Sequence, residues 1–505
     1  MSELIDRFRL DRAHGAHVVM TFLVLAYGLV NLFFGEVVPA GGGLGWDGVV
    51  YASIVRNLWT MISHGQMTGY YAQRLLPSVI VRGMLIVSGA EFTNGNIIRA
   101  FDLYNLTLLL FATIIWKRIA DSLELSIASR WVGFGGIFVN FLIAKQVMYA
   151  PVSTDVTAMV ISMLLLLFYL QRRPFALLFT MVAGSFVWQI TGLCGALLMV
   201  FMHARFSESE ISGSNVRSSA KRKFKRAALF LWMVLITICV FAYIALPHML
   251  SPEQLESEGG HKLERLIAGL PSLIAVVVAV AVLLGSIRLI GSVASKLAEI
   301  PPGALALAVA GVLIPHIIVR SISNPGLPNA NSFSQVLEWV VFPLNGEGKF
   351  LMPLVTLSVF WGPALLLMII VWDQVCVELR RLGPGAMAIV GLNMPLALVT
   401  EPRYVIGAWP FVITALVLAL QKRKRRNSFP YAFLALSVAS AQFWLPMNLR
   451  PWTGADVDGL LEFPKQLLFM HYGPWMSWSS YLIQLAVVLL SAAWLRGTLL
   501  IDEKS

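Results

Sequence analysis

The sequence predicts an all-α bundle of transmembrane helices, and three observations support this fold class. The chain has 505 residues, of which 58% are hydrophobic and 13% charged, whereas soluble domains are about half apolar and about a quarter charged. Apolar runs of about twenty residues, the length that crosses a bilayer as a helix, recur along the whole chain. In these runs, as in Ser162–Leu167, apolar and polar positions do not alternate, which excludes the strands of a membrane β-barrel.

The hydropathy pattern predicts a single transmembrane domain, residues 1–505, with about 12 to 14 spans. The spans are predicted at residues 18–38, 101–116, 131–148, 156–171, 174–188, 189–203, 227–246, 268–290, 303–320, 351–372, 384–400, 404–420, 429–446 and 476–496. The stretch 174–203 is too long for one span and short for two, so Gln189 and Gly192 predict a break between two helices. Because no small-residue cleavage site follows the first apolar run, we expect the first span to be a retained anchor.

The formal net charge is +11, and the basic residues cluster in short connections between the predicted spans. The clusters are Lys117–Arg118, Arg172–Arg173, residues 221–226, Arg380–Arg381 and residues 422–426. Lys and Arg accumulate in the cytoplasmic loops of membrane proteins, so both termini and the basic loops 204–226 and 421–428 are predicted to be cytoplasmic. This placement favours contact with anionic membrane lipids and argues against a nucleic-acid partner.

The opposite, outer face carries longer loops, predicted at residues 39–100, 149–155, 247–265, 321–350, 400–403 and 447–475. In the first of these loops, apolar residues recur at helical spacing, namely Val49, Val50, Ile54, Leu58, Trp59 and Ile62. Such a stripe predicts an amphipathic helix that lies in the membrane interface.

Four polar features stand out in the outer loops. They are Asp47 between Trp46 and Tyr51, Asp155 at the end of Tyr149–Asp155, the pair Gln73–Arg74 near Arg82, and the run Thr400–Tyr404. An aspartate at the interface is suited to accept a proton from a hydroxyl group. Arginine presents a planar fork that matches phosphate oxygens and stabilises charge on a departing phosphate. With access from the lipid, these residues predict glycosyl transfer from a polyprenyl-phosphate sugar to a hydroxyl acceptor.

The pattern Trp46-Asp47-Gly48 followed by Tyr51, directly after the first span, resembles the first-loop aspartate motif of the GT-C glycosyltransferases. These multi-spanning enzymes use polyprenyl-phosphate sugars, and the mannosyltransferases of glycolipid-anchor synthesis have a similar W-D-G-x-x-Y pattern. The segment Tyr149–Asp155 resembles their acidic second outer loop. Glu401-Pro402-Arg403-Tyr404 resembles the late loop that holds the lipid phosphate.

The resemblance implies roles for the residues of these motifs. Asp47 is implied to be the general base of a direct transfer with inversion at the anomeric carbon. Asp155 is implied to orient the acceptor or to help bind a divalent cation, Mg or Mn, although the first loop lacks a clear D-x-D or E-x-D pattern. The departing phosphate is assigned to Arg403, with Arg74 as the second candidate and with Glu401 and Tyr404 beside it.

The substrate cavity implied by the resemblance is lined by Trp46, Tyr51, Tyr149, Gln189 and His316. Its donor is a polyprenyl-phosphate sugar, such as an undecaprenyl-phosphate sugar, and its acceptor is a glycolipid, a cell-surface polysaccharide or a protein. We expect the protein in the inner membrane of a bacterium, with the site facing the periplasm.

Other interpretations of the same residues stay open. Asp47 and Asp155 also suit the N-cap positions of the helices that follow them, Arg403 suits an interfacial anchor neutralised by Glu401, and His316 suits a buried interior position. For the whole protein, one alternative is a flippase or transporter of lipid-linked glycans. Transporters place ionisable residues near mid-membrane, and most of the predicted spans lack them.

A further alternative is an O-antigen-type ligase or polymerase. Such proteins concentrate arginines and a histidine in a large late outer loop, and the loop 447–475 contains Arg450 and His471. The transferase interpretation is preferred because nothing in that loop corresponds to Asp47.

Overall fold

The computed structural model describes residues 2–211, 280–327, 351–399, 401–423, 428–444, 446–448 and 478–500. Several predictions concern residues outside these ranges. They are the span 227–246, the outer loop 247–265, most of the loops 321–350 and 447–475, the first part of the span 268–290, the basic residues 221–226, and the residues Thr400, Arg450 and His471.

Within the described residues every regular element is a helix, which confirms the predicted all-α class. Four of these helices are long and apolar enough to cross a membrane: α1 (Ser2–Phe34), α5 (Asn94–Ser122), α15 (Pro302–Ile322) and α25 (Trp478–Leu500). A further candidate is the bent pair formed by α6 (Ile127–Phe138) and the segment Leu142–Tyr149, whose halves meet at 56°. The other apolar helices in this part of the chain have 10–17 residues. The number of spans therefore stays a prediction, whereas the membrane character of the chain is supported.

Two further apolar stretches are interrupted helices. The stretch 174–203 forms α9 (Pro174–Gly184) and α10 (Thr191–Val200), so the predicted break is confirmed and Gln189 lies within it. The predicted span 351–372 divides into α17 (Met352–Trp361) and α18 (Pro363–Ile370). Gly362 separates them with φ 73° and ψ −165°, a conformation that glycine adopts without the steric cost of a side chain.

The first outer loop forms a compact unit of short helices. They are η1 (Ala40–Gly43), α2 (Trp46–Ser63), α3 (Gly69–Ala72) and α4 (Leu75–Ser88). A helix, α2, forms where the amphipathic helix is predicted, and its place in the membrane interface stays a prediction. Its apolar stripe was partly misplaced. Tyr51, Val55 and Leu58 are buried, whereas Val49 and Trp59 are 43% and 70% exposed. The side of α2 that carries Tyr51 and Leu58 packs against α4 and α5, which turns the other two side chains outward.

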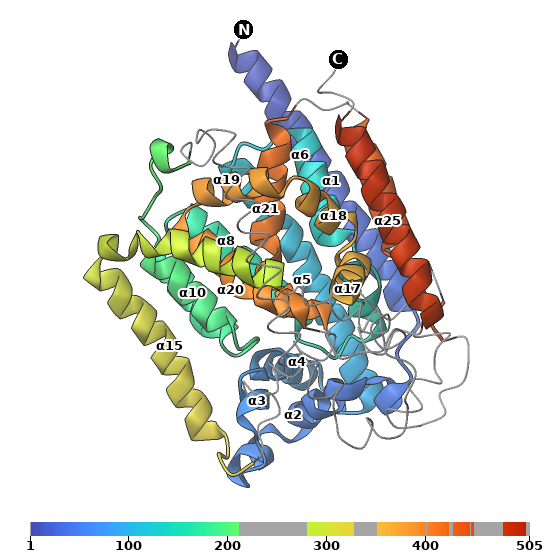
Figure 1. The fold of residues 1–505 in the computed structure, drawn as a ribbon. Coiled ribbons are helices and arrows are strands. Elements are labelled where there is room, and N and C mark those ends of the chain that lie inside the picture. Colours follow the sequence, from blue (N-terminus) through green and yellow to red (C-terminus); the bar gives the residue numbers. More distant parts are fainter. Residues whose placement is uncertain are drawn as a thin grey trace, which may run out of the picture.

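The core is built by α5, α6, α8 (Asp155–Leu170) and α21 (Trp409–Gln421), with α5 packed on α8 and α21 packed on α6. The start of α1 and the end of α25 lie at one end of the bundle, and α2, α3 and α4 lie at the other (Figure 1). This agrees with the expectation that the two chain ends share a side and that the first outer loop lies opposite them.

Hydrogen bonds and ion pairs join the predicted basic connections at the end where α1 begins. The buried Glu378 of α19 (Trp372–Leu382) pairs with Lys422 at 2.7 Å and with Arg381 at 2.6 Å. The side chain of Gln421 accepts a hydrogen bond from the backbone N–H of Ser126, just before α6. The end of α21 and the start of α6 are therefore in contact, although they are far apart in the sequence.

Candidate functional site

The predicted aspartates lie in the first turns of two helices. Asp47 is the second residue of α2, and Asp155 is the first residue of α8. The N-cap positions belong to Gly45 and Thr154, so the alternative in which the aspartates are the cap residues was wrong. The helix dipole favours negative charge in the first turn of a helix.

Arg403 brings these two helix starts together. Its Nη2 lies 3.6 Å from Asp47 Oδ2, and its Nη1 lies 3.9 Å from Asp155 Oδ2. Its Nε donates a 2.7 Å hydrogen bond to Glu401 Oε2. The four residues Asp47, Asp155, Glu401 and Arg403 are called the carboxylate cluster below. One guanidinium thus contacts carboxylates from three separate parts of the chain, an arrangement that the sequence motifs did not predict.

The members of the carboxylate cluster differ in their contact with solvent. The side chain of Asp155 is 2% exposed, and neither of its oxygens has a hydrogen-bond partner in the described part of the chain. The side chain of Asp47 is 35% exposed. Asp47 is therefore open to solvent, whereas Asp155 is enclosed by the protein.

Glycine at position 48 allows the two helix starts to approach. A Cβ atom on Gly48 would stand 3.0 Å from the carbonyl oxygen of Val152 and 3.1 Å from its Cβ, so α2 lies directly on the loop before α8. That loop is fixed from the other side by Asn105 of α5, whose amide donates a 2.9 Å hydrogen bond to the Pro151 carbonyl. The Gly of the W-D-G pattern thus has a packing role.

The third segment of the site is the turn η5 (Pro402–Val405). The indole N–H of Trp361 donates a 3.0 Å hydrogen bond to the Pro402 carbonyl. The ring of Trp361 stacks on Trp409 of α21 with centroids 4.5 Å apart. Two buried tryptophans therefore set the position of the turn that carries Arg403.

Arg74 lies close by in a different environment. Its guanidinium carbon is 4.1 Å from the centroid of the Tyr70 ring and 4.4 Å from that of Trp188. Its Nη1 donates a 3.2 Å hydrogen bond to the hydroxyl of Tyr51. The Trp188 ring in turn contacts Tyr404, with centroids 5.8 Å apart. Arg74, Tyr51, Tyr70 and Trp188 are called the Arg74 site below.

Burial raises the pKa of the Tyr51 hydroxyl. This group stays protonated at neutral pH, so it can donate a hydrogen bond as well as accept one. Tyr70 and Trp188 are not among the site residues that the sequence predicts. Their signals were present: Tyr70 stands four residues before Arg74, and Trp188 adjoins Gln189 in the predicted helix break.

The structure thus gathers seven predicted residues, Asp47, Tyr51, Arg74, Asp155, Glu401, Arg403 and Tyr404, at one end of the bundle. Four others are placed differently. Trp46 is 45% exposed beside Asp47. Gln189 is exposed in the break between α9 and α10, and His316 is exposed on α15, so the prediction that His316 is an interior histidine was wrong. Its neighbour Pro315 takes the buried position instead.

Tyr149 belongs to a second polar group. Its hydroxyl donates a 3.0 Å hydrogen bond to Asn448 Oδ1. The carboxylate of Glu36 accepts hydrogen bonds from the backbone N–H groups of Met447 and Asn448 and pairs with Lys145 at 2.9 Å. This group joins the end of α1, the bent helix and the segment after α22 (Phe429–Ser440).

The carboxylate cluster does not fit the divalent cation suggested by the sequence. Its acids converge on the Arg403 guanidinium, a position that a cation would have to share with a positive charge. In the described ranges, no group of three or more His, Cys, Asp or Glu side chains is arranged to hold a metal ion. We therefore assign no step to a metal.

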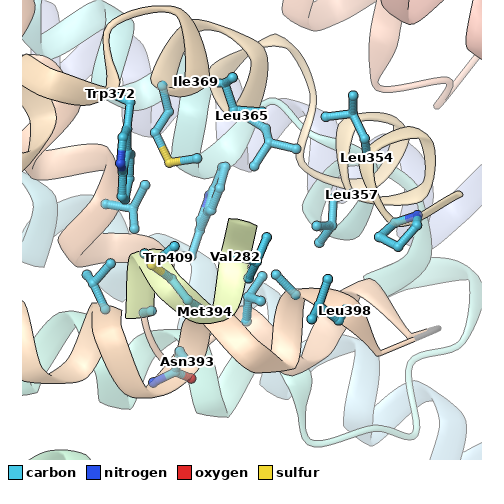
Figure 2. Close-up of a pocket in the computed structure, with 18 of the residues that line it drawn as sticks. Val282, Leu354, Leu357, Leu365, Ile369, Trp372, Asn393, Met394, Leu398 and Trp409 are labelled. Atoms are coloured by element: carbon cyan, nitrogen blue, oxygen red, sulfur yellow. The ribbon is translucent and has the colours of Figure 1, made fainter. Parts of the chain in front are cut away.

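An apolar pocket of about 480 Å³ begins beside the η5 turn. Figure 2 shows its wall, with Trp372 and Trp409 toward one side and Leu354, Leu357 and Leu398 toward the other. Its lining comes from the helix Val280–Ala294 and from α17, α18, α19, α20 (Pro384–Asn393), η4 (Met394–Leu398), η5 and α21. Val405 lines the pocket and stands two residues after Arg403, so the pocket and the carboxylate cluster share one turn.

Among the described residues of the lining, the one clearly polar side chain is that of Asn393, and its amide nitrogen is used locally. Its nitrogen donates to the Ile389 carbonyl at 2.9 Å and to Cys194 Sγ at 3.8 Å. The pocket therefore offers its contents almost only hydrocarbon contacts.

No protein-family model, curated protein or solved structure matches the chain. The fold and the helix lengths define the class of the protein as an all-helical protein with apolar helices able to cross a membrane.

Proposed function

We propose that the protein is an integral-membrane glycosyltransferase that moves a sugar from a polyprenyl-phosphate donor to a hydroxyl acceptor. The observation that carries this proposal is the contact of Arg403 with Asp47 and Asp155 at one end of the bundle. A reachable carboxylate, two arginines and an apolar pocket beside them supply the parts that the reaction needs.

In the proposed reaction, Asp47 accepts the proton of the acceptor hydroxyl. The oxygen attacks the anomeric carbon as the bond from that carbon to the phosphate oxygen breaks, and the electron pair of this bond leaves with the lipid phosphate. The configuration at the carbon inverts. Arginine side chains stabilise the charge on the departing phosphate, and Asp155 orients the acceptor or Arg403.

The apolar pocket supports a lipid-linked donor. Hydrocarbon groups are stabilised in an apolar lining by about 0.8 kcal/mol for each buried CH₂ group. A polyprenyl chain in the pocket would place its phosphate near the η5 turn, because Val405 belongs to both. The acceptor is a glycolipid, a polysaccharide or a protein, and membrane lipids surround the chain.

The proposed location is the inner membrane of a bacterium, with the end that carries α2 facing the periplasm and both termini in the cytoplasm. The basic connections Arg380–Arg381 and Lys422–Arg423 at the other end agree with the charge rule for cytoplasmic loops. No nucleic acid has a part in this function.

The test is a turnover assay with purified protein in lipid, comparing the wild type with Asp47→Asn. A panel of undecaprenyl-phosphate sugars is supplied with membrane extract as acceptor, and released polyprenyl phosphate is measured. We expect release by the wild type and its loss in the variant. Absence of release with every donor would contradict the proposal and favour a flippase or a ligase.

A further inference from the structure

The two arginines of the site differ in the partners that they already have. Arg403 faces three carboxylates, those of Asp47, Asp155 and Glu401. Arg74 has no carboxylate partner in the described residues, and its recorded side-chain contacts are the Tyr51 hydroxyl and the rings of Tyr70 and Trp188. An anion that approached Arg403 would meet the carboxylates as well, and like charges at such distances repel.

The Arg74 guanidinium has an unused edge. Nη1 is occupied by the Tyr51 hydroxyl, whereas Nε is buried and has no hydrogen-bond partner among the residues described. The whole residue is only 2% exposed. A buried donor without a partner is unfavourable, and a buried charge without a counterion is more so. These costs are removed when an anion takes the free edge.

The shape of that edge specifies the anion. Nε–H and Nη2–H of a guanidinium point in parallel and match two oxygens of a phosphate or carboxylate group. The two rings cover the guanidinium carbon at 4.1 Å and 4.4 Å, and the Tyr51 hydroxyl limits its rotation. The Arg74 guanidinium is thus held in a fixed orientation, and its Nε–Nη2 edge is suited to bind an anion through two parallel hydrogen bonds.

We infer that Arg74 is the ligand of the donor phosphate and that Arg403 is a positioning residue, which holds Asp47 and Asp155 in place. This inference rests on the proposed function and reverses the ranking of the two arginines that the sequence suggested. Trp188 and Tyr70 orient Arg74 through their rings and do not themselves touch the reacting atoms.

The test measures phosphate binding apart from catalysis. Full-length protein in nanodiscs of zwitterionic lipid is titrated with undecaprenyl phosphate, which carries no sugar. We expect Arg74→Lys to weaken binding about tenfold or more, because Lys keeps the charge but loses the bidentate fork, and Arg403→Lys to change binding by less than about twofold. Trp188→Leu should weaken binding less than Arg74→Lys.

The matched control is Arg82→Lys in the same outer loop. Arg82 donates through Nη1 to the backbone carbonyls of Val55 and Arg56 and lies over the Phe92 ring, so part of its guanidinium is already engaged by the protein. Its variant should bind undecaprenyl phosphate as the wild type does. Thermal unfolding of each variant shows that a loss of binding is not a loss of fold.

Kinetics separate the two arginines in a second way. Arg74→Lys should raise KM for the donor, whereas Arg403→Lys should lower kcat with little change in KM, because the second substitution disturbs the carboxylates and not the phosphate ligand. A larger loss of undecaprenyl phosphate binding in Arg403→Lys than in Arg74→Lys would overturn the inference and leave the transferase proposal intact.

Phosphatidylglycerol and inorganic phosphate are titrated in parallel to identify the source of the anion. Equal binding of all three probes, lost in Arg74→Lys, would support the Arg74 anion site while removing its link to a polyprenyl donor. Binding of none of the three by folded wild type would overturn the inference. The turnover assay decides the proposed function separately.

Discussion

Arg403 Nη1 lies 3.9 Å from Asp155 Oδ2, and the side chain of Asp155 is only 2% exposed. Neither oxygen of Asp155 has a hydrogen bond within the described ranges. The positive charge closest to Asp155 among the described residues therefore comes from the η5 turn, about 250 residues further along the chain.

This relationship predicts a strong coupling between the two residues. Arg403→Ala should destabilise the protein by about 3 kcal/mol, because it leaves a buried carboxylate without its cation. The double variant Arg403→Ala with Asp155→Asn should recover much of that loss. The measurement is the thermal or denaturant midpoint of all four proteins of the cycle in one detergent. Additive effects of the two substitutions would show that the pair is not coupled.

Asp47→Asn should lower turnover by a factor of about 10² to 10⁴, the range for loss of a general base. Binding of undecaprenyl phosphate and expression should stay near those of the wild type, because Asp47 is partly exposed and the change keeps its shape. Released polyprenyl phosphate is the readout. Retention of most activity would remove Asp47 from the base role. Asp155→Asn is the comparison, and its defect should include a change in stability as well.

Gly48→Ala should reduce both stability and turnover. Its Cβ would stand 3.0 Å from the Val152 carbonyl oxygen, so α2 and the loop before α8 should separate by a few tenths of an ångström, at a cost of about 1–3 kcal/mol. Gly83→Ala on α4 is the control, since nothing lies within 4 Å of a Cβ there. Equal behaviour of the two variants in unfolding and turnover assays would show that the close approach at Gly48 is not required.

Glu36 predicts a dependence of stability on pH. Burial raises the pKa of Glu36, but hydrogen bonds from the backbone of Met447 and Asn448 and the Lys145 ammonium outweigh it, so the pKa lies below its ordinary value of 4.5. A depressed pKa means that the stabilisation is complete above the unfolded pKa and is lost as the pH falls through the folded pKa.

Glu36→Gln should therefore cost about 1.5 kcal/mol at neutral pH, the range for hydrogen bonds to a charged group. The difference from the wild type should shrink as the pH falls below about 4.5. Unfolding midpoints of both proteins across this interval provide the measurement. A difference that stays constant with pH would contradict the assigned role of the carboxylate.

Single cysteines test the predicted orientation. Trp46 beside Asp47 and Ser428 at the start of α22 are both exposed, and they flank opposite ends of the bundle in the predicted topology. In a background without Cys194, Cys239 and Cys376, a membrane-impermeant maleimide should label Trp46→Cys from outside intact cells and Ser428→Cys only after permeabilisation. Labelling of both from the same side would overturn the topology.

The sequence by itself determined the helical class and most of the polar residues of the site. Apolar runs such as 303–320 and 476–496 predict helices because a bilayer leaves few other ways to satisfy the backbone. Charged residues in an apolar chain are costly without a task or a partner, so Asp47, Asp155 and Arg403 stood out before any fold was known.

Only the tertiary structure decided which of these residues meet and what each one faces. The ranking of Arg74 and Arg403 depends on contacts between segments distant in sequence: three carboxylates converge on one guanidinium, and the rings of Tyr70 and Trp188 cover the other. The same holds for His316 and Tyr149, whose residue types suit a cavity but whose helices carry them elsewhere. The periodicity of apolar residues indicates which face of a single helix is buried. The distance between side chains on different helices depends on how those helices pack against each other.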